Sequence, residues 1–162
     1  MEAKSQLDSQ LPAMMKFMDG ELNRFVKSCA NEARIRTREH PPSPWNPGPF
    51  ATGATMAALY LVWQGGDDFM ARVQDALALG GQDLATHVMG QEELPQVRPH
   101  EYAALLAAPL DYNYGVHWGI ANRKAQPFML QGTEDSREAM DHATEEVGRK
   151  LQAFVEASHR TR

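Results

Sequence analysis

The sequence contains a single cysteine, Cys29, and no segment that would carry the chain into or across a membrane. One cysteine cannot form an intramolecular disulfide, and it offers neither a CxxC redox pair nor a zinc knuckle. The N-terminal segment is polar and lacks the basic start and apolar run of a signal peptide. The most apolar stretch, residues 56–63, is far shorter than the roughly 20 residues that cross a bilayer. These absences predict a soluble protein without membrane association in a reducing compartment, most simply the cytoplasm.

An excess of positive charge is also missing. The 16 basic and 21 acidic residues give a formal net charge of −5, and the acidic residues are dispersed rather than clustered. Because nucleic-acid-binding domains usually carry a basic excess, nucleic acid is not an expected partner. With 43% hydrophobic and 23% charged residues, the 162-residue chain has the composition of one folded domain spanning residues 1–162.

Familiar catalytic and ligand-binding motifs are absent. The chain has no GxSxG elbow, Walker loop, GxGxxG, HExxH or EF-hand loop. Glu138, His142 and Glu145 share one face of a helix, but that face is opposite the apolar stripe, whereas metal sites in helical bundles project inward. We therefore predict no metal site and no cofactor. Catalysis has no assigned motif, and a non-enzymatic protein is favoured.

The first regular element is an amphipathic helix. Apolar residues recur at helical spacing from Leu11 to Cys29. Pro12 suits a first helical turn, where its missing N–H would be unpaired anyway, so residues 1–10 are expected to be frayed. Pro41 ends the helix at or before the residue that precedes it.

Three methionines, Met14, Met15 and Met18, cluster on this helix. Their adaptable side chains would suit a binding surface. Because they share a stripe with Leu22 and Phe25, we expect them to pack in the core instead.

The last turns of the same helix change character. The stripe positions become Glu32 and Arg36, so the apolar side is expected to end about two turns before the helix does. Arg34, Arg36 and Arg38 complement the helix dipole there. This tail is predicted to be either a solvated helix end or a projection that binds a partner through the three arginines.

Residues 41–50 are rich in proline, which removes backbone donors and excludes a helix or a central strand. Trp45 and Phe50 are large apolar rings that are normally buried. We interpret the segment as an ordered strap over the core, with Trp45 as a further candidate partner contact.

Residues 54–64 are predicted to form the central helix. Residues 56–63 leave no polar face, as in a helix buried on all sides. Gly65 and Gly66 end it.

Asp67 and Asp68 supply capping acids for the next helix, which we expect to be broken at Gly80-Gly81 because two glycines disfavour a continuous helix. Its apolar stripe comprises Met70, Val73, Leu77, Leu84 and Val88.

Toward the C-terminus, a short helix is expected at 99–108 and a β-hairpin or an ordered loop near 114–131. A long final helix is capped by Thr133. Its apolar face comprises Met140, Ala143, Val147, Leu151, Phe154 and Val155. The fold class predicted is mainly α: a compact bundle of about five helices around a buried central helix.

Residues 111–118 form the best candidate ligand site, because aromatic rings and polar groups in an irregular segment often line pockets. His117 could act as an acid or base near neutral pH, oriented by Asp111. The remaining candidate ligand contacts are Tyr112, Asn113, Tyr114 and Trp118. The alternative is that the rings anchor the segment to the core while His117 faces water.

Two functions remain open. One is a non-enzymatic interaction or regulatory protein of the adaptor, accessory, inhibitor or immunity type, whose partner is another protein or a second copy. The other is a small-molecule-binding protein or small enzyme that uses residues 111–118.

Overall fold

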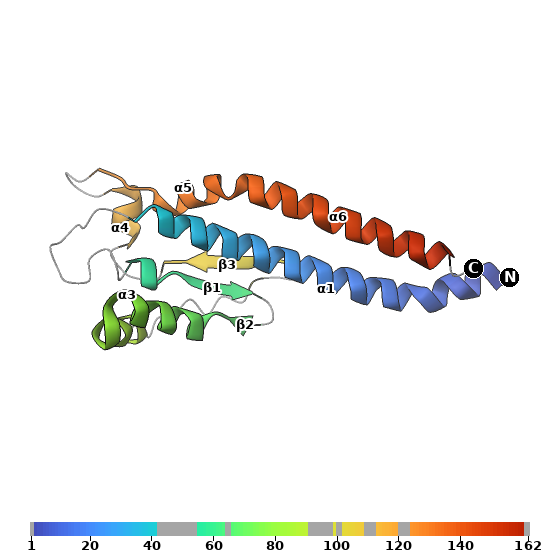
Figure 1. The fold of residues 1–162 in the computed structure, drawn as a ribbon, viewed down its shortest axis with the longest axis horizontal. Coiled ribbons are helices and arrows are strands. Elements are labelled where there is room, and N and C mark those ends of the chain that lie inside the picture. Colours follow the sequence, from blue (N-terminus) through green and yellow to red (C-terminus); the bar gives the residue numbers. More distant parts are fainter. Residues whose placement is uncertain are drawn as a thin grey trace.

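The computed structural model describes residues 2–41, 55–63, 66–90, 99, 102–108, 113–119 and 124–160. The predicted strap at 41–50, with Trp45, lies outside the described residues apart from Pro41. The chain is mainly helical, which confirms the predicted class, and it adds a small antiparallel sheet (Figure 1). The elements are α1 (Glu2–Glu39), β1 (Tyr60–Trp63), β2 (Gly66–Asp67), α3 (Phe69–Met89), β3 (Ala104–Ala107), α4 (Asn113–Trp118), α5 (Phe128–Asp135) and α6 (Arg137–Arg160).

The longest helices, α1 and α6, run antiparallel along the long axis of the molecule (Figure 1). The halves of α1 and α6 nearer the chain ends, here residues 11–29 and 140–158, form an arm whose outer part extends past the sheet and α3. Phe17 and Phe154 stack across the arm with ring centroids 4.3 Å apart. Helix α1 begins at Glu2, ahead of Pro12, so it is longer at its N-terminus than predicted.

The sheet replaces the predicted central helix. Among the described residues of this segment, helix is present at 55–57, and the chain then enters β1, which pairs with β2 on one side and β3 on the other. The register places Leu61 opposite Leu106 and Val62 opposite Asp67. The helix prediction for 54–64 was wrong because a run without a polar face also suits a strand buried on both sides. Its β-branched and aromatic residues favour that strand.

Two further predictions toward the C-terminus were wrong. The helix expected at 99–108 contains β3 instead, which lies antiparallel to β1. The β-hairpin considered near 114–131 is replaced by α4 and the start of α5. Both segments are too short for periodicity to separate helix from strand.

Helix α3 confirms the predicted break. Gly80 and Gly81 leave helical geometry, and Gly81 has a φ of 69°, in the left-handed region that favours glycine. The predicted stripe is confirmed only after the break, where Leu84 and Val88 are buried. Before the break the phase was wrong, since Met70 and Leu77 are exposed. The break rotates the two halves of α3 relative to each other, so the residues that face the core do not follow one continuous stripe.

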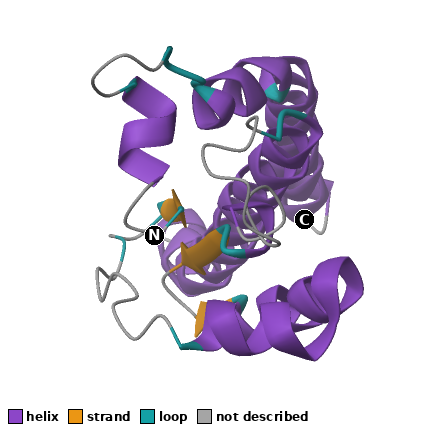
Figure 2. Cartoon of the chain, turned by 90° about the vertical axis from the view of Figure 1, so that its left-hand side faces the viewer, coloured by secondary structure: helices purple, strands orange, loops and turns teal. Residues whose placement is uncertain are grey.

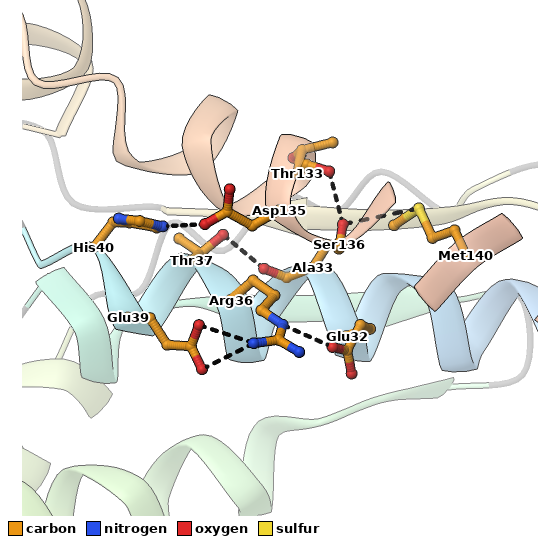
Figure 3. Close-up of polar contacts among 10 residues, drawn as sticks. All are labelled: Glu32, Ala33, Arg36, Thr37, Glu39, His40, Thr133, Asp135, Ser136 and Met140. Carbon is orange, nitrogen blue, oxygen red and sulfur yellow. Dashed lines mark hydrogen bonds and ion pairs between the residues drawn. The ribbon is translucent and has the colours of Figure 1, made fainter. Parts of the chain in front are cut away.

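The tail of α1 lies in the core rather than beyond it. Ala33 and Thr37 are buried, and α5 packs on this stretch (Figure 3). The Thr37 hydroxyl donates to the Ala33 carbonyl over 2.7 Å. On the facing helix, Gly132 lies so close that a Cβ there would overlap the backbone N and Cα of Thr37. Small residues, not large apolar ones, therefore bring these helices together.

The C-terminal helix is confirmed with a different start. A turn at the buried Ser136 separates α5 from α6, and the Ser136 hydroxyl donates to the Thr133 carbonyl over 2.8 Å (Figure 3). Thr133 does not cap α6, because its own hydroxyl donates to the Met129 carbonyl within α5. The predicted face of α6 is only half-buried, since α1 is the helix that it packs on along the arm.

Candidate functional site

The described part of the 111–118 segment is helix α4, at the end of the molecule opposite the arm tip. Asp111 and Tyr112 lie outside the described residues, and the side chains of Asn113 and Tyr114 are not described. Of the six candidate residues, the structure therefore describes the side chains of His117 and Trp118 only. Figure 2 views the molecule from the end at which α4 lies.

His117 is packed among aromatic rings. Its imidazole lies edge-on to Trp118, with centroids 4.7 Å apart, and to the buried Phe128, at 5.5 Å. Burial lowers the pKa of His117. Its Nδ1 is buried and makes no hydrogen bond with the described residues. Trp118, in contrast, is 62% exposed. This geometry is that of a neutral imidazole held by packing.

The three arginines of the α1 tail divide into two kinds. Arg34 forms a buried ion pair with Asp68 at the start of α3, and Arg38 bonds Asp75 of α3 over 2.5 Å. Burial, and next the positive charge of Arg38, lowers the pKa of Arg34. These two side chains connect α1 to α3 within the chain.

Arg36 points away from that contact and bonds Glu32 and Glu39 on its own helix, at 2.9 and 3.2 Å (Figure 3). Of the three arginines it is the most exposed, and a partner-binding role for it stays a prediction. Near the end of α1, His40 Nε2 contacts Asp135 Oδ2 at 2.6 Å, which ties the helix end to α5.

The arm carries an apolar surface that the sequence assigned to the core. A groove of about 340 Å³ runs between α1 and α6. Beside it, Leu11 and Met15 of α1 are 48% and 59% exposed. The groove is lined by Met14, Met18, Leu151, Gln152, Phe154, Val155 and Glu156. In the sequence, the methionine cluster indicated this surface. It was assigned to the core because it shares a stripe with Leu22 and Phe25.

Within the described ranges, no three His, Cys, Asp or Glu side chains gather closely enough to hold a metal ion. No helix in this part of the chain is both long and apolar enough to cross a membrane. Comparison with protein-family models, with curated proteins and with solved structures found no match in any of the three.

Proposed function

We propose that this protein is a non-enzymatic interaction protein that works as a dimer, joined through the arm. The observation that carries the proposal is the uncovered apolar groove between α1 and α6, with Met15 and Leu11 beside it. Burying one side chain of this size contributes about 1.5–3 kcal/mol. Contiguous exposed apolar surface of this kind marks an interaction site.

The spacing on α1 fits a helical partner. Leu11, Met15 and Met18 are all more than 40% exposed and recur at i, i+4 and i+7, so they form one stripe beside the groove. On α6, Leu151 and Val155 are four residues apart on the facing side of the groove. A helix laid along this seam would contact both sets, as in helix-in-groove recognition.

The charges of the two arm helices are complementary, because α6 is net negative and α1 is net positive along the arm. Along α6, the arm residues 140–158 carry four acidic and two basic residues, a net charge of −2. Along α1, residues 11–29 carry three basic and two acidic residues, a net charge of +1. In a two-fold dimer, α1 of each copy lies against α6 of the other, and two arms complete a four-helix bundle.

The test is the mass in solution, measured by light scattering after gel filtration over a range of concentrations. The wild type is expected at the mass of two chains. Met15→Glu and Met18→Glu place charges on the groove rim and are expected to give folded monomers, with the helical circular dichroism unchanged. Met89→Glu, at a methionine that is 46% exposed on α3, is the matched control and should remain dimeric.

A wild type that stays monomeric at about 100 μM would refute dimerisation. A dimer that persists in both arm variants would place the interface elsewhere on the chain.

The second function, a small-molecule site at 111–118, has less support. The unpaired Nδ1 of His117 favours it, but the rings of Trp118 and Phe128 occupy the space around the imidazole. We also propose a cytoplasmic location, which the single cysteine supports.

A further inference from the structure

A second hollow, of about 690 Å³, lies between α1, β1 and the start of α3. Its volume is within the range of small-molecule sites. It combines apolar rings with polar groups from three elements. The lining residues are Lys27, Asn31, Arg34, Leu61, Trp63, Asp67, Asp68, Phe69, Met70 and Ala71.

Both carboxylates of the hollow are already engaged. Asp68 pairs with Arg34 and accepts the Leu61 N–H over 2.7 Å. Asp67 accepts the Phe69 N–H over 3.0 Å. Asp67 also accepts a hydrogen bond from the Tyr60 hydroxyl. Burial, and next this hydrogen bond, raises the pKa of Tyr60. Arg34 neutralises Asp68, and the negative charge of Asp67 acts on the buried Arg72 guanidinium.

Lys27 is the cation available to a ligand. Its Nζ lies 4.0 Å from the centroid of the Trp63 ring, on the ring face. It makes no ion pair with a carboxylate in the described part of the chain. A cation held on an aromatic face can pair with an incoming anion while the ring contacts the anion's apolar body.

A second cation, Arg72, lies behind the wall of the hollow, where the Asp67 carboxylate acts on it electrostatically. Arg72 is fully buried, and none of its guanidinium nitrogens makes a hydrogen bond within the described part of the chain. The guanidinium lies 5.2 Å from the ring centroids of Tyr60 and Phe69, and Phe69 lines the hollow. A buried charge without a hydrogen-bonded partner is costly, so an anion placed nearby is stabilised.

The charges in and behind the hollow therefore leave one positive charge uncompensated. Lys27, Arg34 and Arg72 are positive, whereas Asp67 and Asp68 are the carboxylates. One negative charge on a ligand balances the site, and two aromatic rings offer stacking surface for a flat apolar body.

We propose that this hollow binds a small monoanion with a flat apolar body, of the aryl carboxylate class. Lys27 pairs with the carboxylate, while Trp63 and Phe69 contact the ring system. The site shares no lining residue with the groove between α1 and α6, and this inference does not rest on dimerisation.

The test uses 2-naphthoate and its neutral isostere 2-naphthamide in an NMR titration. The signals followed are the Trp63 indole N–H and the backbone amides of Met70 and Ala71. Because a charge-assisted hydrogen bond contributes about 1.5–3 kcal/mol, naphthoate is expected to bind at least about tenfold more tightly than naphthamide.

Lys27→Gln removes the charge from an exposed side chain and should weaken naphthoate binding about tenfold while leaving naphthamide unchanged. Lys16→Gln, on the same helix but outside the hollow, is the matched control and should bind both probes like the wild type. Equal affinity for the two probes would overturn the proposal. So would naphthoate binding that is unaffected by Lys27→Gln, or shifts that map elsewhere than this hollow.

Discussion

Helix α5 approaches the tail of α1 closely because residue 132 is a glycine and has no side chain. The backbone N and Cα of Thr37 occupy the position that a Cβ on residue 132 would need. Thr37 and the nearby Ser136 are both fully buried, and each satisfies its hydroxyl with a carbonyl of its own helical segment. The contact is therefore close and leaves no buried hydroxyl unpaired.

Gly132→Ala is expected to destabilise the fold by about 2 to 3 kcal/mol, because the added methyl must push α5 away from backbone atoms that cannot rotate aside. Urea denaturation followed by circular dichroism measures the change. Gly148→Ala is the control, since that glycine lies in α6 with nothing within 4 Å of its Cβ position. The control should gain about 0.5 to 1 kcal/mol from helix propensity alone. Equal effects at both sites would contradict the contact.

The signal for this contact is present in the sequence but is weak. Ala33 and Thr37 are small and four residues apart, as are Gly132 and Ser136. Periodicity analysis weights large apolar residues, so Glu32 and Arg36 made the tail look like a solvated end. Nothing in the spacing shows that two such pairs face each other from positions about 95 residues apart.

At the scale of the element, the α1 tail belongs to the core because of ion pairs as well as packing. The side chains of Arg34 and Asp68 are only 12% and 8% exposed. A solvated or partner-binding tail, the two alternatives predicted from the sequence, would leave stability unaffected by changes at Arg34 and Arg38. The Arg34–Asp68 pair reverses that expectation at Arg34, because removing one partner leaves a nearly buried charge uncompensated.

Arg34→Ala is expected to cost about 3 kcal/mol or more, since it strands the Asp68 carboxylate. Arg36→Ala, two residues later, should leave the unfolding midpoint unchanged, because Arg36 pairs with Glu32 and Glu39 of its own helix on the outer surface. Thermal unfolding of the two variants side by side measures the difference. Similar midpoints would show that the Arg34–Asp68 pair does not hold the tail.

Helices with a clear period could be predicted from the sequence, and short apolar segments could not. The stripes of α1 and α6 and the glycine break in α3 gave the correct element type. The run at 56–63 is apolar at every position, so its period is uninformative. Its conformation depends on β3, which adds the second pairing edge from residues 104–107. The second hollow also depends on this sheet, so sequence reasoning could not find it.

At the scale of the molecule, burial and hydrophobicity run in opposite directions along α1. The most apolar stretch lies in the arm, with Met15 and Met18 exposed, whereas the charged tail holds the buried Ala33 and Thr37. The helix spans about 57 Å at 1.5 Å per residue, so its two ends experience different surroundings.

Amide hydrogen exchange should follow this gradient. In dilute protein, amides at 31–39 are expected to exchange slowly and those at 11–18 quickly, because local opening is easiest where few buried contacts form. In concentrated protein the arm amides should slow if arms pair, while the amides of α3 should not change. Mass spectrometry at two protein concentrations reads both effects. Slow exchange at 11–18 in the monomer would contradict the gradient.

Both ends of the chain lie at the tip of the arm (Figure 1). A pulling force applied between the two ends would separate α1 from α6 progressively. The contacts between the two helices would break one turn at a time, from the stacked Phe17 and Phe154 inward. The hydrogen bonds of the sheet would not be sheared together, because the sheet lies outside the line of force. Tethered by its termini, the molecule would stretch softly until the force reached the close contact at Gly132.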